Sequence, residues 1–255
     1  MMRHKYLFLL FTLASSLLVP VTQAEELPAP IKAIEARGAT IVGEFTAPGG
    51  LRGYAARYSG QGLALYLTAD GQHVLIGTLF DAQGQDLTSA PLNRLVYEPM
   101  AKEMWARMEG STWIADGSKN ATRIVYLFDD PNCPYCNAFW HQARPWVESG
   151  KVQLRHIMVG LLSPDSVGKA AALLTAKQPE VALKEHEAAG NDSKLRALQN
   201  IPADIQKKLD ANLALMSELG AVATPAIFYR DDSGRLKMQQ GLPPAQGLVD
   251  IMGPR

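Results

Sequence analysis

Cysteine is scarce in this sequence, with only two among 255 residues, at positions 133 and 136. A surplus of charge is also absent, since 25 Lys and Arg residues balance 25 Asp and Glu residues. No nucleic-acid partner is expected, because a basic patch or excess is the electrostatic footprint of such proteins. Beyond the N-terminus there is no long apolar run, so a membrane-embedded body is excluded. The composition is that of a globular protein.

The N-terminal residues 1–24 have the order of a secretory signal peptide. Arg3 and Lys5 precede an apolar run over 6–19, and Thr22-Gln23-Ala24 follows as a cleavage site. The run is shorter than the roughly 20 residues that a membrane span needs, although an uncleaved anchor is the alternative. We expect cleavage, export to a compartment where disulfides persist, and no membrane insertion after signal removal.

Residues 25–85 predict a small domain with one helix and an antiparallel sheet. The helix is expected over 30–37. Runs rich in strand formers, divided by turn signals such as Asp70-Gly71, cover 39–46, 51–58, 63–68 and 74–80. A domain of this size is marginally stable alone and would gain from burying surface against a second copy.

Residues 86–118 predict a helical linker, and residues 119–255 a second, α/β domain. In the linker, apolar residues recur at helical spacing; the alternative is a helix packed wholly within the second domain. In the second domain we expect strands over 121–128, 152–159, 226–229 and 235–240, and helices over 133–148, 166–178, 181–189, 203–219 and 244–252. The fold class is therefore α+β in the first domain and α/β in the second.

The two cysteines form the motif Cys133-Pro134-Tyr135-Cys136 between a buried strand and a helix. Cys133 falls at the expected N-cap, and Pro134 takes the first helical position, where a missing N–H costs nothing. Unpaired backbone N–H groups stabilise an anion there, so Cys133 should have a lowered pKa and act as the attacking thiol. Cys136 lies one turn further along, placed to resolve a mixed disulfide. We predict a redox-active pair that cycles between dithiol and disulfide.

Other roles for the pair are weaker. A structural disulfide would close too short a loop to stabilise the fold much. Half of a zinc site is possible, but His141 and His156 do not have ligand spacing and no further cysteine exists. We therefore expect no metal and no cofactor.

Thr224-Pro225 directly precedes an apolar strand. A proline there cannot extend the strand ladder, and a Thr-Pro bond can be cis. Strand, C-x-x-C helix and a later proline before a strand together resemble the thioredoxin fold. The resemblance implies a cis Pro225 beside the dithiol, with Thr224 and Pro225 contacting an extended substrate. It also leaves room for a helical insertion over 166–219.

A closer resemblance covers nearly the whole chain after the signal. The stretch from Phe128 to Leu154, with Asp130-Pro131, the dithiol and the run Ala143-Arg144-Pro145-Trp146-Val147, is similar to the DsbG-type thiol–disulfide interchange proteins of the DsbC/DsbG family. The family implies a V-shaped periplasmic homodimer held by its N-terminal domains. It also implies substrates that are oxidised or misfolded periplasmic proteins, and a dithiol kept reduced by the membrane protein DsbD.

One departure from ordinary thioredoxins concerns proton transfer. Thioredoxins carry a buried acid six residues before the first cysteine, and Leu127 stands there in this sequence. Asp129 and Asp130 are the nearest acids. We expect both to be solvated turn residues, since turns commonly use Asp, and the proton acceptor for Cys136 stays open.

Three functions are considered. The leading one is a reductase or isomerase that acts on wrong disulfides or on sulfenic acids. A net disulfide-forming oxidase is the first alternative; it is disfavoured because Tyr135 offers no cation to stabilise the neighbouring thiolate. Chaperone activity in a cleft between two copies is the second, and it can coexist with the first.

Overall fold

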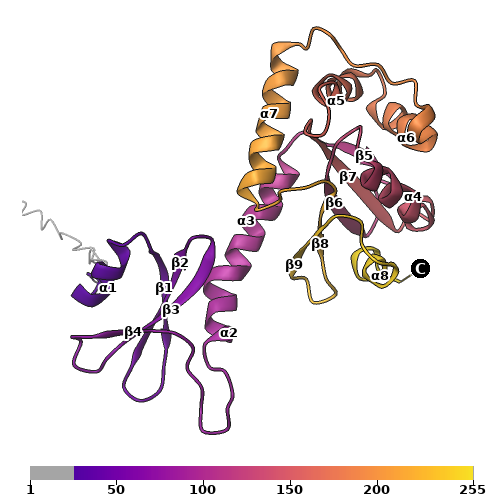
Figure 1. The fold of residues 1–255 in the computed structure, drawn as a ribbon. Helices are drawn as coiled ribbons and strands as arrows, with labels where there is room; N and C mark the ends of the chain where they lie inside the picture. The colour runs from indigo at the N-terminus through magenta and orange to yellow at the C-terminus, as the bar shows by residue number, and fades with distance from the viewer. Residues whose placement is uncertain (1–25, 255) are drawn as a thin grey trace, which may run out of the picture.

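The computed structural model describes residues 26–254 as two sheet-containing units joined by helices (Figure 1). The predicted signal peptide over 1–24 lies outside the described residues. Among the helices of residues 26–254, none has both the length and the apolar character of a membrane span.

The first unit is a four-stranded antiparallel sheet with strand order β1-β2-β3-β4. Its elements are α1 (Ala29–Glu35), β1 (Thr40–Thr46), β2 (Arg52–Tyr58), β3 (Gln61–Leu67) and β4 (Val74–Ile76). Alternate residues of β2 serve opposite faces. Tyr54 packs with Ile31 of α1, whereas Ala55 packs with Val96 of the following helices. The helix and sheet predicted for this domain are confirmed, with β4 shorter than expected.

Three consecutive helical segments connect the two units: α2 (Ser89–Leu92), the π-helical segment η1 (Asn93–Tyr97) and α3 (Glu98–Glu109). Pro99 lies in the first turn of α3, directly after the π-helical segment, and the helix continues through this junction because Tyr97 and Glu98 both have helical backbone angles. Val96 packs on the first sheet, and Met108 packs under the second. The helical run therefore reaches from one sheet to the other, as Figure 1 shows.

The second unit is a five-stranded mixed sheet with order β5-β7-β6-β8-β9. Its elements are β5 (Ile114–Asp116), β6 (Arg123–Asp129), α4 (Pro134–Glu148), β7 (Val152–Met158), α5 (Ser166–Thr175), α6 (Pro179–Ala189), η2 (Gly190–Asp192), α7 (Ala203–Glu218), β8 (Ala226–Arg230), β9 (Leu236–Gln240) and α8 (Ala245–Met252). Strand β5 falls inside the range predicted as linker, and it pairs with β7. The sheet thus begins before residue 119.

The two faces of this sheet have different helical covers. Val125 and Leu127 of β6 point to the face covered by α4 and α8. Tyr126 and Phe128 point to the other face, which α3 and α7 cover. The insertion between β7 and β8 is helical, as predicted, and consists of α5, α6, η2 and α7.

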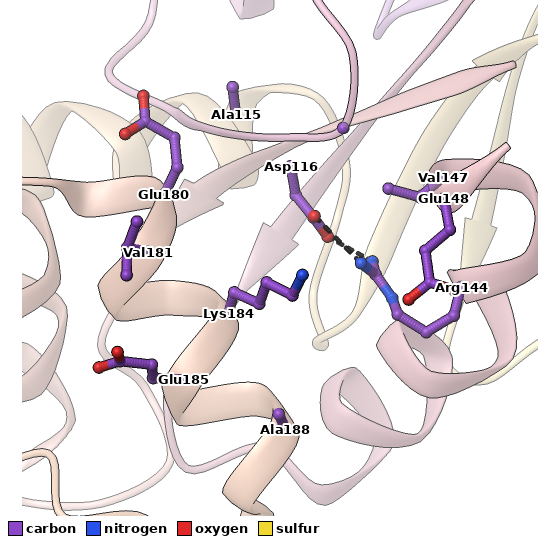
Figure 2. Close-up of a pocket in the computed structure, with 11 residues that line it drawn as sticks. Ala115, Asp116, Arg144, Val147, Glu148, Glu180, Val181, Lys184, Glu185 and Ala188 are labelled. Atoms are coloured by element: carbon purple, nitrogen blue, oxygen red, sulfur yellow. Dashed lines mark hydrogen bonds and ion pairs between the residues drawn. The ribbon is translucent and has the colours of Figure 1, made fainter. Parts of the chain in front are cut away.

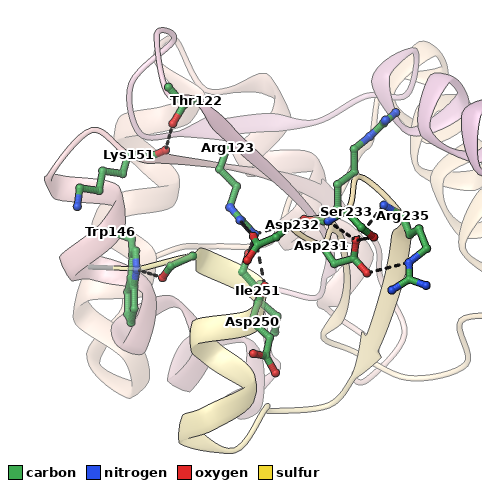
Figure 3. Close-up of polar contacts among 12 residues, drawn as sticks. Thr122, Arg123, Trp146, Lys151, Asp231, Asp232, Ser233, Arg235, Asp250 and Ile251 are labelled. Atoms are coloured by element: carbon green, nitrogen blue, oxygen red, sulfur yellow. Dashed lines mark hydrogen bonds and ion pairs between the residues drawn. The ribbon is translucent and has the colours of Figure 1, made fainter.

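Arg123, at the start of β6, ties the C-terminal helix to the sheet (Figure 3). Its guanidinium donates to the carbonyls of Arg230 and Ile251 and pairs with Asp232 at 2.7 Å. Trp146 of α4 donates to the Gly253 carbonyl at 2.8 Å. These contacts lie at the end of β6 opposite the dithiol, and they fix α4 and α8 against one sheet face.

Candidate redox site

The register of the sheet brings the two predicted site segments together. Strands β6 and β8 are antiparallel, with Phe128 opposite Ala226. The residues before β8 therefore lie at the carboxyl end of β6, where α4 begins. The Thr224–Pro225 bond is cis, and the Cys133 thiol donates to the Thr224 carbonyl at 3.5 Å.

Cys133 caps α4 as the sequence predicts. Its backbone is extended, its carbonyl accepts from Asn137 N at 3.1 Å, and Pro134 occupies the first turn. Its sulfur accepts from the backbone N–H of Cys136 at 3.2 Å. Only 4% of the surface of Cys133 is exposed, so the residue is buried. At a helix N-terminus the backbone N–H groups and the helix dipole stabilise a negative charge, so a capping sulfur carries that charge more readily than an uncapped one.

The two thiols have opposite acidities. Hydrogen bonding from Cys136 lowers the pKa of Cys133 to about 7, against the raising effects of burial and of Asp129. Burial raises the pKa of Cys136 well above its ordinary value, and the neighbouring Cys133 and the Asp129 charge act in the same direction. Near neutral pH, Cys133 is therefore partly thiolate while Cys136 holds its proton.

Exposed apolar side chains lie on the segments that adjoin Cys133. Tyr135 follows it directly and is 61% exposed, and Val222, two residues before Thr224, is 83% exposed. Leu161 and Leu162 are also exposed, and their backbone N–H groups bond to Asp130 in the turn before Cys133. These side chains offer an apolar surface around the reactive sulfur.

A polar cavity of about 440 Å³ opens beside Cys133. Glu187 of α6 lies in its wall and is 2% exposed. Asn137 Nδ2 donates to the Glu187 carboxylate at 2.8 Å and so joins α4 to α6. Burial and the charge of Asp129 raise the pKa of Glu187 to about 8, so this carboxyl holds a proton at neutral pH.

The expectation that Asp129 and Asp130 are solvated is wrong, since each is only 1% exposed. Asp130 folds the turn. One of its oxygens accepts from Asn132 N and Ser166 Oγ, both at 2.8 Å, and the other accepts from Leu161 N at 2.6 Å and Leu162 N at 3.0 Å. A turn carboxylate with this many backbone donors is stable in the interior without solvent.

Asp129 belongs to a buried chain of alternating charges. Its Oδ2 lies 2.7 Å from Nδ1 of His156, which is fully buried. His156 Nε2 lies 3.7 Å from Asp116 Oδ2, and Asp116 is bonded through both oxygens to Arg144 of α4 (Figure 2). Burial opposes the charged imidazole, but the two carboxylates outweigh it and raise the pKa of His156 to about 9.

All six predicted site residues lie around one point of the fold, the N-terminus of α4 and the loop before β8. Sequence reasoning placed Asp129 in solvent, considered His156 only as a zinc ligand, and did not single out Glu187. A signal existed for His156, because it alternates with Val152 and Leu154 and so faces the core. No comparable signal marked Glu187, since glutamate is common on helix surfaces.

Two parts of the chain match known protein families. Residues 114–253 match the thioredoxin-like domain family, and residues 22–89 match the N-terminal domain of the disulfide bond isomerase proteins. The chain is thus a two-domain protein of the disulfide isomerase class.

Individual relatives make the assignment specific. The chain is 61% identical to the thiol:disulfide interchange protein DsbG of Pseudomonas aeruginosa, over 92% of this chain and 91% of that protein. It is 46% identical to DsbG of Escherichia coli, over 93% and 96% of the two chains. Identity to a probable DsbC of Bordetella avium is 26%, over 71% and 59%. This chain belongs to the DsbG family of thiol:disulfide interchange proteins.

Proposed function

We propose that this protein is a periplasmic thiol–disulfide oxidoreductase of the reductase and isomerase type, with Cys133 as nucleophile and Cys136 as resolving thiol. The observation that carries the proposal is the asymmetry of the pair. Cys133 caps a helix and has its pKa lowered to about 7, while Cys136 is buried with a raised pKa. One thiol is ready to attack, and the other stays protonated until a mixed disulfide forms.

The chemistry proceeds in two exchanges. The Cys133 thiolate attacks a substrate disulfide, or condenses with a substrate sulfenic acid and releases water, to give a mixed disulfide. Cys136 then attacks Cys133, which frees the substrate thiol and leaves the Cys133–Cys136 disulfide. Two electrons pass from the dithiol to the substrate. A membrane reductant of the DsbD type would return them.

Substrate contact is proposed for the loop before β8 and the apolar side chains around it. Thr224 and Pro225 lie next to the Cys133 sulfur, and Tyr135 and Val222 are the exposed apolar neighbours. An extended segment of an oxidised or misfolded protein suits this surface, because its side chains meet apolar groups while its backbone meets the loop. The same surface supports a chaperone activity that would survive loss of the thiols.

The oxidase alternative fits the site less well. A strong oxidant needs a thiolate that is far more stable than its mixed disulfide, with a pKa of roughly 3.5. The pKa of Cys133 is lowered only to about 7, and Tyr135 brings no positive charge to it.

Homodimerisation through residues 25–85 is proposed, with 86–118 as linker and 119–255 as catalytic domain. Strand β4 is an edge of the first sheet, and Leu75 and Ile76 on it, with Phe80 four residues beyond its end, are each more than half exposed. An unpaired edge with apolar side chains is a natural surface for a second copy.

Substrate trapping tests the proposal. In Cys136→Ala the mixed disulfide cannot be resolved, so periplasmic partners should accumulate on Cys133, and Cys133→Ala should trap none. The redox state of the pair in the intact compartment decides direction: a mostly reduced pair supports the reductase and isomerase, whereas a mostly oxidised pair supports the oxidase. We expect the main substrates to be proteins whose single cysteine has become a sulfenic acid; trapped partners that all contained several cysteines would rule this out.

A further inference from the structure

The resolving step needs a base for the Cys136 proton, and Leu127 stands where thioredoxins carry an acid. Strand geometry offers a replacement. Residues two apart on a strand share a face, so Asp129 faces the same side as Leu127, about 7 Å nearer the carboxyl end of β6. Leu127 packs against Phe139 of α4. Asp129 therefore lies toward the first turn of α4, where Cys136 is buried.

The Asp129 carboxylate is buried, and only one of its two oxygens accepts a hydrogen bond. Its Oδ2 is bonded to His156, whereas Oδ1 has no hydrogen-bond partner among the described residues. Burying a carboxylate oxygen without a hydrogen-bond donor costs free energy. Such an oxygen is free to accept a hydrogen bond or a proton. Asp130, its neighbour, has no free oxygen, because each of its two oxygens accepts two hydrogen bonds.

Asp129 is the first member of a row of four charged side chains. His156 and Arg144 supply two positive charges, and Asp116 supplies the second negative charge, so the four side chains form a balanced row from β6 through β7 and β5 to α4. In such a row each buried charge has a partner of opposite sign, which offsets the cost of removing it from water. The negative charge of Asp129 raises the pKa of both thiols, which is consistent with a position close to the dithiol.

Glu187 is the rival acid, on the α6 side of the cavity. Its carboxylate is already bonded to Asn137, and it holds a proton at neutral pH. A protonated carboxyl cannot accept the Cys136 proton in the resolving step. It therefore serves as the matched comparison, since it is equally buried and also lies near Cys133.

We infer that Asp129 is the proton acceptor for Cys136, and that His156 is the positioning residue that holds the Asp129 carboxylate through its Oδ2. The inference rests on the proposed function of the dithiol. In the step, the Cys136 S–H proton moves to Asp129 Oδ1, and the Cys136 sulfur attacks Cys133 in the mixed disulfide. The Cys133–Cys136 bond forms as the bond to the substrate sulfur breaks. The substrate leaves as a thiolate and receives the proton from Asp129, directly or through water, so the base is restored.

The two exchanges can be timed separately in the full-length reduced protein with an aromatic disulfide such as dithiobis(nitrobenzoate). Attack by Cys133 releases one coloured thiolate, and resolution by Cys136 releases a second. Asp129→Asn should slow the second release by roughly 10²-fold, the usual size of a general-base contribution. The first release should persist and be faster below neutral pH, because removing the Asp129 charge lowers the pKa of Cys133.

Glu187→Gln is the comparison variant and should change the second release by less than about threefold. An unchanged second release in Asp129→Asn, or an equal slowing in Glu187→Gln, overturns the inference. Loss of the first release in the unsubstituted protein would instead refute the proposed function.

Asp129→Asn leaves His156 as a buried charge with one partner fewer, which can prevent folding. The double variant Asp129→Asn/His156→Gln removes both charges and lets two amides bond to each other. It should fold and still resolve slowly. A double variant that folds and resolves as fast as the unsubstituted protein would also overturn the inference.

Discussion

His156 Nδ1 lies 2.7 Å from Asp129 Oδ2 in the interior of the second domain, with neither side chain in contact with solvent. Folding raises the pKa of His156 from its ordinary value of 6.5 to about 9, because two carboxylates outweigh the cost of burial. A raised pKa means that the folded state binds the proton more tightly than the unfolded state. The resulting stability is complete below about pH 6.5 and is lost as the pH rises through about 9.

This relationship predicts a pH-dependent stability of about 3 kcal/mol, since each pKa unit corresponds to about 1.4 kcal/mol. Urea unfolding should be measured near pH 6.5 and near pH 9.5. The background should be Cys133→Ser/Cys136→Ser, because the lowered pKa of Cys133 acts in the opposite direction over the same window. His156→Gln in this background should remove most of the dependence. An equal dependence with and without the histidine would contradict the assignment.

Asp130→Ala should destabilise the second domain by about 3 kcal/mol, because it leaves three part-buried backbone N–H groups and the buried Ser166 hydroxyl without their acceptor. Asp165→Ala is the matched control. Asp165 directly precedes α5, and its side chain is 48% exposed and bonds only to Lys169 and Asn132, so the loss should be much smaller. Chemical denaturation of both variants decides, and equal losses would refute the structural role of Asp130.

Tyr135→His should lower the pKa of Cys133 further, by roughly one unit, because an imidazolium would lie beside the thiolate. Tyr135 is 61% exposed, so the fold should be unaffected. Thiolate absorbance against pH gives the pKa directly. Tyr135→Phe should leave it near 7. The histidine variant should also be found more oxidised at a fixed glutathione ratio; an unchanged pKa would mean that the side chain points too far from the sulfur to act on it.

How far the sequence could predict the structure depends on the range of the interactions involved. The N-cap position of Cys133 follows from a local pattern, a strand followed by Pro134 and a helix, and it is confirmed. The meeting of Thr224 with Cys133 needed the resemblance to thioredoxin, since it depends on the pairing of β6 with β8. The burial of Asp129 could not be predicted locally. An Asp at the end of a strand is as compatible with an exposed turn as with a buried site. The cost of burying Asp129 is offset by His156, which comes from β7 and is distant in the sequence.

The edge strand β4 leads to the last prediction, which concerns assembly. Leu75 is 57% exposed and Phe80 is 58% exposed, although both belong to the small first unit, which gains most from further burial. In a two-fold symmetric dimer each substitution is present twice. Leu75→Lys/Phe80→Lys should therefore weaken dimerisation by roughly 10²–10³-fold, which corresponds to about 3–4 kcal/mol for four apolar side chains removed from the interface.

Sedimentation or native mass measurement over a dilution series gives the dissociation constant. Leu213→Lys is the control, because Leu213 is 38% exposed on α7, in the other unit of the chain, and its substitution should leave the dimer intact. The substituted β4 variant should still release both thiolates from the aromatic disulfide, since the dithiol lies wholly within the second unit. A dimer that persists in it would place the interface elsewhere, because lysine charges on a paired edge repel their symmetry copies.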